Sequence, residues 1–380
     1  MMTKNNFKKA FLVLAGAFSL QTMNAQEEAD KGTFTFNGYV DVNYFKNFNN
    51  PLSGSNTGTS GFARAFDQKD NSFGLGLVQG KMTYVYKKST VVADLTFGPY
   101  GDLGNYGNVI GSVAGGSTAL SIKQAYITHA FTDKFSLTAG QFGTHVGYEV
   151  IDAPLNFNYS LNNLFNNGPF YHIGLKAEYA VSSKFGLMAG VVNNWDNLYD
   201  NNKYKTAIAQ AKFIASDKLA FYLNYVGGNE TGVTDTAGTA LFNGDDTTSA
   251  FKQLGDLVIT YQLTDKFYIG FNGVVGASKV SGTTSNWGGV ALYSNYAFTD
   301  KFALGVRADY FDNTEGVMYI GNTQVQSYTL TGKITLADGH LMIKPEVRYD
   351  MYGNNQFEDE TGAFTNKAQL TAGAAAIYKF

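Results

Sequence analysis

The chain repeats one short stretch, Phe131-Thr-Asp-Lys-Phe135, with close variants at 181–185, 215–219, 263–267 and 298–302. Each copy places polar turn residues between an apolar end and an apolar start, and successive copies begin 34 to 50 residues apart. That spacing leaves room for one long strand, a loop and a second long strand between copies. The repeat therefore predicts an all-β fold, a transmembrane up-and-down antiparallel β-barrel with short periplasmic turns and long extracellular loops.

The composition favours such a barrel over a soluble domain or a bundle of membrane helices. The 380 residues include 43 Gly, 25 Tyr and 30 Phe, and only 16% of them are charged, where soluble domains carry about 25%. A mean hydropathy of −0.16 is too low for a bundle of membrane-spanning helices. Barrel strands need apolar residues spread at alternate positions, because one face of the strand meets lipid and the other meets water. The chain has no cysteine, so its stability must come from backbone pairing.

The first 25 residues have the layout of a secretory signal peptide. Three lysines precede an apolar stretch at 10–20, and a polar run then ends at Ala25. This pattern predicts export through the Sec pathway, cleavage near Ala25 and a short linker at 26–32. The alternative, an N-terminal membrane anchor, is disfavoured because about eleven apolar residues are too few to span a bilayer. Removing three lysines changes the net charge from −3 to −6, which argues against a nucleic-acid partner.

The turns also give the number of strands. Two further turns, at 87–89 and 337–339, complete a series of seven; seven turns join fourteen strands, and one strand at each terminus makes about sixteen. The stretch 341–350 alternates most clearly, with apolar side chains on one face and four charged ones on the other. The stretches 73–86 and 120–131 alternate poorly. A barrel of sixteen strands is wide enough to enclose an aqueous lumen.

Alternation also predicts which charged side chains point into the lumen. They carry both signs, and six of them belong to the strands expected near 301–310 and 341–350. Two interpretations remain open: strips of opposite charge that set up a transverse field across the pore, or solvated residues that form local salt bridges. The predicted lumen charges are Asp41, Asp94, Lys176, Glu178, Arg307, Asp309, Lys344, Glu346, Arg348 and Asp350.

One predicted outer loop, 144–169, differs from the others in composition. It is rich in apolar side chains, which have no use in a loop surrounded by water and should pack against something. Inside a wide barrel the available surface is the inner wall, so we expect this loop to fold inward and narrow the pore. Carboxylates there would favour cations or polar neutral solutes. The predicted constriction residues are Glu149, Asp152, Tyr148 and Tyr159. The alternatives are a cap over the barrel mouth and a contact between subunits.

The C-terminus and the histidines complete the sequence-based predictions. The last strand ends with Tyr378 and Phe380 on its apolar face, and this pattern resembles the signal that the outer-membrane barrel assembly machinery reads. The four histidines are scattered, and no phosphate loop, paired-cysteine metal site or nucleophile elbow is present. We therefore predict no catalytic, cofactor or metal site. Barrel enzymes of the outer membrane do exist, but they are built with fewer strands.

The segment around this loop also resembles a known family. The run Gly140-Gln-Phe-Gly-Thr-His-Val-Gly-Tyr-Glu149, followed by Asp152, Asn156, Tyr159-Ser160 and Gly168-Pro-Phe-Tyr-His-Ile-Gly174, resembles the putative β-barrel porin-2 (OmpL-like) family, which is common in Bacteroidota. The resemblance implies a barrel over 33–380 in the outer membrane of a Gram-negative bacterium, with no catalytic residues to carry over. In sixteen-stranded diffusion porins the loop after the fifth strand likewise folds into the lumen.

Three functions are compatible with this sequence. The first is a porin that lets small hydrophilic solutes diffuse passively through an aqueous lumen, without a cofactor. The others are a substrate-selective channel and a structural or adhesive barrel with a plugged lumen. The expected partners are the lipid bilayer with its lipopolysaccharide, the assembly machinery and the solutes, and a homotrimer is left open. The chain is too short for an energy-coupled transporter with a plug and twenty-two strands.

Overall fold

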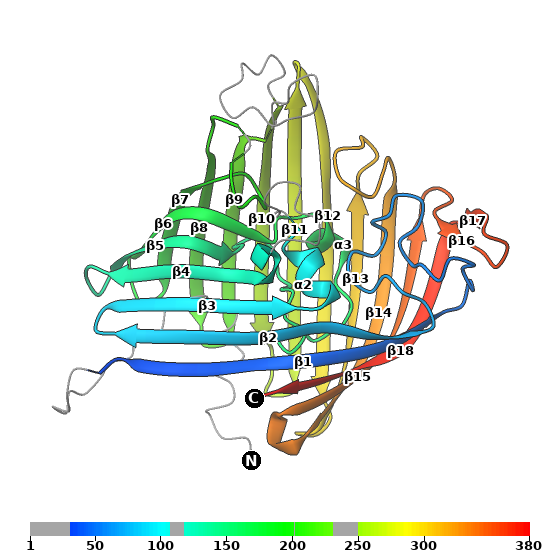
Figure 1. Cartoon of the computed structure of the whole chain (residues 1–380), viewed down its shortest axis with the longest axis horizontal. Helices are drawn as coiled ribbons and strands as arrows, with labels where there is room; N and C mark the ends of the chain where they lie inside the picture. The colour runs from blue at the N-terminus through cyan, green and yellow to red at the C-terminus, as the bar shows by residue number, and fades with distance from the viewer. Residues whose placement is uncertain (1–30, 107–117, 201, 231–249) are drawn as a thin grey trace.

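The chain folds into one closed antiparallel barrel of sixteen strands in this computed structural model, which describes residues 31–106, 118–200, 202–230 and 250–380 (Figure 1). The predicted fold class and strand number are confirmed. The barrel strands are β1 (Thr33–Asn47), β2 (Ser72–Tyr86), β3 (Ser89–Phe97), β4 (Ile122–Ala130), β5 (Phe135–Gly143), β6 (Tyr171–Ala180), β7 (Phe185–Val192), β8 (Thr206–Ser216), β9 (Leu219–Asn229), β10 (Ala250–Gln262), β11 (Phe267–Val280), β12 (Thr283–Ala297), β13 (Phe302–Asp312), β14 (Gln324–Leu336), β15 (Leu341–Tyr352) and β18 (Ala368–Lys379).

The first and last strands close the barrel. β1 pairs with β18 in antiparallel register, with Tyr39 opposite Lys379. Beyond the last paired residues, the N–H of Gly38 donates to the carbonyl of Phe380 at 3.2 Å, and the N–H of Phe380 donates back at 3.0 Å. An even number of strands allows every neighbour to be antiparallel, so the closed ring leaves no unpaired strand edge.

The repeated stretch forms the short turns, as predicted. In the β4–β5 turn the Thr132 hydroxyl accepts hydrogen bonds from the N–H groups of Lys134 and Phe135, at 3.2 and 3.0 Å. The same two bonds recur at Thr299 in the β12–β13 turn, and equivalent ones are made by Ser182 and Thr264. The hydroxyl at this position thus satisfies the backbone donors of the turn, which explains why the phrase recurs.

The loops at the opposite end are longer, with one exception. We name them by residues: L1 (48–71), L2 (98–121), L3 (144–170), L4 (193–205), L7 (313–323) and L8 (353–367). L2 contains α2 (Pro99–Gly104) and the 3-10 turn η1 (Thr118–Ser121), L3 contains α3 (Asn163–Asn166), L8 contains the hairpin of β16 (Phe357–Glu358) and β17 (Phe364–Asn366), and η2 (Ala337–Gly339) forms the β14–β15 turn. The exception is the connection between β11 and β12. There β11 and β12 continue to a two-residue turn, Ser281-Gly282, with φ of 47° and 89°.

Side chains alternate between lipid and lumen along the strands. On β15 the inward side chains are buried and those between them are mostly exposed. The two stretches that alternate poorly in sequence contain or face ladder irregularities: the β1–β2 register shifts near Val40, and the β3–β4 register shifts near Asp94. An extra residue breaks the period of two, so the pattern is lost where the bulge lies. Pro345 interrupts the ladder between β14 and β15, which resumes on either side of it.

Some predictions concern residues that the structure does not describe. The signal peptide at 1–25 and most of the linker at 26–32 lie outside the described residues, as does most of the loop between β9 and β10. Among the described residues, no helix is long and apolar enough to cross a membrane. The described part of the chain also contains no group of three or more side chains that could hold a metal ion.

Candidate pore constriction

L3 enters the barrel and reaches the strands on the side opposite to its origin. The N–H of Gly147 donates to Asp256 on β10 at 3.1 Å, and the N–H of Tyr148 donates to Asn272 on β11 at 3.3 Å. The Tyr148 ring stacks on Tyr293 of β12 with the ring centroids 4.0 Å apart. α3 is seen inside the ring of strands, beside β12 and β13 (Figure 1). L3 therefore lies in the lumen and does not cap it from outside.

Two charged side chains of the barrel wall hold the middle of L3. The Glu346 carboxylate on β15 accepts hydrogen bonds from the N–H groups of Tyr159 and Ser160, at 2.7 and 3.0 Å. The Arg307 guanidinium on β13 pairs with Glu149 at 2.8 Å and also donates to the carbonyl of Ser160. Both wall residues are buried. The wall thus provides acceptors and donors that match the backbone groups of this loop.

Two further cations of β15 bind carbonyl groups of L3. The Lys344 ammonium donates to the carbonyls of Ala153 and Asn156, at 2.6 and 2.7 Å. The Arg348 guanidinium donates to the carbonyl of Leu161 at 2.6 Å. A loop without secondary structure needs partners for its buried backbone groups. The charged residues of β15 supply these partners, and this explains how an irregular segment can be buried inside the barrel.

L3 also contacts the strands near its own origin. The Tyr159 hydroxyl donates to Asp41 on β1 at 2.9 Å. Asp152 accepts a hydrogen bond from Gln79 on β2 at 2.9 Å and forms an ion pair with Lys123 on β4. L3 is therefore tethered on both sides of the lumen, and the bonds come from strands that are far apart around the ring.

The short helix α3 is fixed by its cap and by the wall. The Asn162 side chain caps the helix by accepting from the N–H of Phe165 at 2.6 Å. The Asn163 amide donates to Asp309 on β13 at 2.6 Å and to Ser327 on β14 at 2.8 Å. These bonds orient the helix against β13 and β14.

The two carboxylates predicted at the constriction face protein groups. Glu149 is 3% exposed and Asp152 is 8% exposed. Burial raises the pKa of the Glu149 carboxyl above its usual range, although Arg307 and the N–H of Asn162 oppose the rise. Both carboxylates are bonded to protein groups that fix the loop, and their contact with passing solutes stays a prediction.

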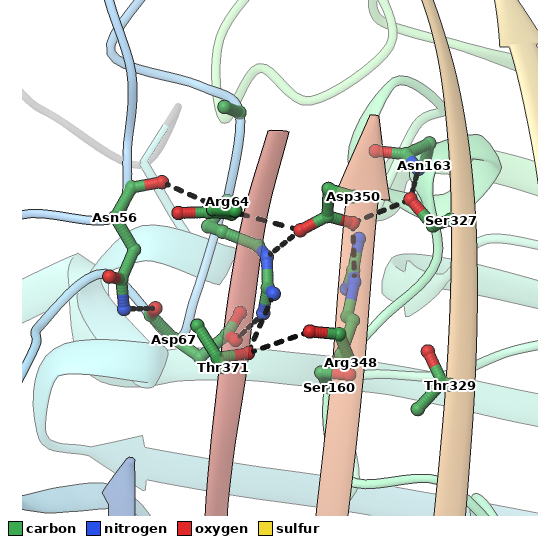
Figure 2. A network of polar contacts seen from close by, with 12 residues as sticks. Asn56, Arg64, Asp67, Ser160, Asn163, Ser327, Thr329, Arg348, Asp350 and Thr371 are labelled. Atoms are coloured by element: carbon green, nitrogen blue, oxygen red, sulfur yellow. Dashed lines mark hydrogen bonds and ion pairs between the residues drawn. The ribbon is translucent and has the colours of Figure 1, made fainter. Parts of the chain in front are cut away.

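L1 is bound to the same wall through a buried network (Figure 2). The Arg64 guanidinium of L1 donates to Asp350 on β15 at 2.7 Å and to Thr371 on β18 at 2.9 Å, and it also pairs with Asp67. Asp350 accepts a second cation, Arg348, at 2.8 Å. Each charge in this network has an opposite charge beside it, as burial requires.

The inner face of the barrel consequently has two unlike parts. We call the inner face of β13, β14 and β15 the covered wall: its inward side chains are buried over 305–311, 325–331 and 342–352. We call the inner face of β2 to β8 the open wall: many of its inward side chains are only half-buried. These are Lys81, Thr83, Thr90, Gln124, Tyr126, Thr128, Ser136, Lys176, Gln210 and Lys212.

The structure distributes the predicted lumen charges over both walls. Nine of the ten are buried and only Lys176 is half-buried. Arg307, Asp309, Lys344, Glu346, Arg348 and Asp350 belong to the covered wall, Asp94, Lys176 and Glu178 to the open wall, and Asp41 to β1. Of the two interpretations left open, local pairing describes their geometry, for example Lys176 with Glu178 at 3.4 Å.

The residues proposed as an assembly signal lie on the outer surface. Tyr378 is 51% exposed and Phe380 is 52% exposed. The Phe380 ring lies 5.9 Å from that of Phe36 on β1, measured between centroids. Both side chains therefore face the lipid beside the closure of the barrel.

Sequence reasoning missed several charged residues of the lumen. Lys123 is the unpaired residue of a bulge, where alternation gives no direction, and Arg64 belongs to a loop. Lys81 lies in one of the poorly alternating stretches. Lys212 could have been found, because it shares the inward face of β8 with Ile208 and Gln210 at a strict period of two.

L4 packs at the outer end of the open wall. Its Asp196 carboxylate accepts hydrogen bonds from the N–H groups of Phe170 and Tyr171, at 2.6 and 3.1 Å, and from the Tyr106 hydroxyl of L2 at 2.9 Å. Burial nevertheless raises the pKa of Asp196 to about 6. A single carboxylate thus joins L2, L3 and L4 at the mouth of the barrel.

Solved structures of outer-membrane proteins share this fold. OmpT of Vibrio cholerae, folded in vitro and in its trimer form, is 14% identical, with a TM-score of 0.59 and coverage of 92% of this chain and 100% of that one. The outer-membrane channel DcaP of Acinetobacter baumannii is 11% identical, with a TM-score of 0.55 and coverage of 94% and 100%. No curated protein matches the sequence.

The family comparison covers the whole barrel. Residues 33–380 match the family described as "Putative beta-barrel porin-2, OmpL-like". The match begins at the first residue of β1 and runs to the end of the chain. This protein therefore belongs to the β-barrel porin-2, OmpL-like family of outer-membrane porins.

Proposed function

We propose that this outer-membrane porin passes small hydrophilic solutes by passive diffusion, and that L3 sets the width of the pore. One observation carries the proposal: L3 is held inside the lumen by bonds from strands on both sides of the barrel, such as Asp256 on β10 and Glu346 on β15. A loop tethered in this way reduces the cross-section through which water and solutes move. The half-buried polar side chains of the open wall support a path on that side of L3.

The proposal is tested by replacing the part of L3 that crosses the lumen. We expect the purified protein to form channels in planar lipid bilayers. Replacement of 150–166 by a short Gly-Ser linker should raise the single-channel conductance severalfold, because the cross-section increases. A matched control replaces the L8 hairpin, 357–366, which lies between the two last barrel strands, and should change the conductance much less.

The outcomes separate the alternatives. Equal conductance before and after the replacement of L3 would show that L3 is not the constriction. No conductance in the unmodified protein, together with channels after the replacement, would favour a structural barrel that L3 plugs. Saturable block of the conductance by one solute would favour a substrate-selective channel. Heat-dependent mobility of the folded barrel in a detergent gel checks that each variant is folded.

We also propose how the protein reaches its membrane. The exposed rings of Tyr378 and Phe380 next to the closing strand pair support recognition by the barrel assembly machinery. The lysine-rich start and apolar stretch at 10–20 support cleavage of a signal peptide near Ala25. Contact with lipopolysaccharide and assembly into a homotrimer belong to the same proposal. Mass spectrometry of the mature N-terminus and the mobility of the unheated protein test these points.

A further inference from the structure

We infer that the open wall makes this pore selective for small anions, carboxylates or phosphates, over cations. The inference rests on the proposed function, because it assumes that solutes pass beside the open wall. It names the class of solute, which neither the family nor the fold specifies.

The inward-facing carboxylates of the barrel are covered by protein. Every inward-facing carboxylate on the described barrel strands is buried. These are Asp41, Asp94, Glu178, Asp256, Asp309, Glu346 and Asp350. Each accepts hydrogen bonds or ion pairs from groups around it; Asp256, for example, accepts from Asn224, from Asn272 and from the N–H of Gly147. Carboxylates that are buried and bonded in this way do not contact the solutes in the pore.

Four lysines of the open wall remain partly exposed. Lys81, Lys123, Lys176 and Lys212 belong to β2, β4, β6 and β8, the alternate strands of the open wall, and all four are only half-buried. Lys123 and Lys176 are paired with Asp152 and Glu178, and the exposed fractions within these pairs are similar, 12% against 11% and 16% against 8%. The excess positive charge therefore rests on Lys81 and Lys212. Lysine carries its charge at the end of a long flexible chain, so its ammonium group can remain in water while its stem is covered.

Positive and negative charges are not balanced on the open wall. On the strands of the open wall and at Asp152 of L3, and without the loop L4 at the outer end, four lysines face three carboxylates, Asp94, Glu178 and Asp152, which leaves a formal charge of +1. The half-buried groups are the positive ones and the buried groups are the negative ones. The remaining charges of the covered wall lie behind L3, which separates them from this path. A narrow, low-dielectric passage focuses such a field on the passing solute.

The experiment measures the reversal potential of single channels in planar bilayers under a tenfold gradient of KCl. We expect chloride to permeate up to about thirtyfold better than potassium, because one positive unit charge at contact distance in water favours an anion about fivefold and disfavours a cation by about the same factor. The double variant Lys81→Gln/Lys212→Gln leaves two lysines against three carboxylates, a formal charge of −1, so the permeability ratio of chloride to potassium should fall to one or below. The control, Lys301→Gln in the exposed β12–β13 turn, should leave the ratio unchanged. Repeating the measurement in 1 M KCl should reduce the preference, because the screening length falls to about 3 Å.

The results distinguish this inference from the function on which it rests. Channels that prefer potassium, or a preference that survives the double variant, would overturn the anion assignment and leave the diffusion pore intact. A protein that never conducts would overturn both. Replacing chloride by acetate or inorganic phosphate shows which anions still carry current. If the double variant gives no channels, the single charge reversal Lys212→Glu, which changes one half-buried side chain, decides the question.

Discussion

On the covered wall, charged side chains hold the backbone of L3 in place, and on the open wall the lysines remain partly exposed. Arg307, Lys344 and Glu346 are buried, and each forms hydrogen bonds with the backbone of L3. Lys81 and Lys212 occupy equivalent inward positions on β2 and β8 and are only half-buried. The residue types and their alternation are alike on the two walls. The difference comes from which wall a distant loop lies against, and substitutions on the two walls should therefore have different consequences.

The largest effect is expected from Arg307→Ala on the covered wall. The substitution leaves the buried Glu149 carboxylate without its cation, and removing one partner of a buried pair costs about 3–5 kcal/mol. We expect a loss of this size in the free energy of unfolding in urea, and larger, noisier single-channel currents because L3 is released. Adding Glu149→Gln to the variant should recover part of the loss, since the uncompensated charge disappears. A loss below about 1 kcal/mol would contradict the tethering role of this pair.

A second prediction concerns pH at the outer end of the open wall, where Asp196 joins three loops. Its pKa of about 6 in the folded protein lies above the usual value for an aspartate. The folded state therefore binds the proton more tightly than the unfolded state. The docking of L4 becomes more stable as the pH falls from about 6 to about 4. Above pH 6 the ionised, buried carboxylate destabilises the docked loop by an amount that no longer changes with pH. A difference of two pKa units corresponds to roughly 3 kcal/mol.

Limited proteolysis of L4 at pH 5 and pH 7.5 measures this effect. Cleavage should be slower at pH 5, after correction for the activity of the protease on an unfolded substrate. In Asp196→Asn the difference between the two pH values should disappear, because the amide cannot ionise but can still accept from Phe170 and Tyr171. Faster cleavage at pH 5 would show that the accepted hydrogen bonds outweigh the cost of burial.

The two walls also explain what the sequence could predict. The turns and the alternation at 341–350 were sufficient to predict the strand number and to place Glu346 and Lys344 inside, because these features depend on neighbours in the sequence. Whether an inward side chain is covered depends on contacts across long separations: Tyr159 and Glu346 are 187 residues apart. The apolar composition of L3 predicted that it would fold inward, but not which wall it would cover. The partners of Glu149 and Asp152, Arg307 and Lys123, could not be predicted for the same reason.

A matched pair of substitutions tests the comparison directly. Lys344→Met on the covered wall leaves the carbonyls of Ala153 and Asn156 buried without a donor, and we expect a loss of about 1–3 kcal/mol in the free energy of unfolding. Lys212→Met on the open wall should change it by no more than about 0.5 kcal/mol, while it lowers the preference for chloride over potassium. Equal losses of stability at the two positions would remove the distinction between the walls.

The smallest loss in the free energy of unfolding is expected for substitutions in the turns, and it should be equal on the two walls. Thr132 lies in the turn between two strands of the open wall, and Thr299 lies in the turn that enters the covered wall. Each hydroxyl accepts the same two backbone N–H groups at an exposed position. Thr132→Ala and Thr299→Ala should therefore each cost about 0.5–1 kcal/mol, the net value of a hydrogen bond, as measured by unfolding in urea.

This equality is informative because the two turns make the same pair of hydrogen bonds from backbone to hydroxyl on both walls. L3 does not contact either turn, so its position cannot make one hydroxyl more important than the other. If Thr299→Ala were clearly more costly than Thr132→Ala, the covered wall would be more sensitive throughout its length, and the contrast at Lys344 could not be assigned to L3. If the two costs agree while those of Lys344→Met and Lys212→Met differ, the covering loop is what distinguishes the walls.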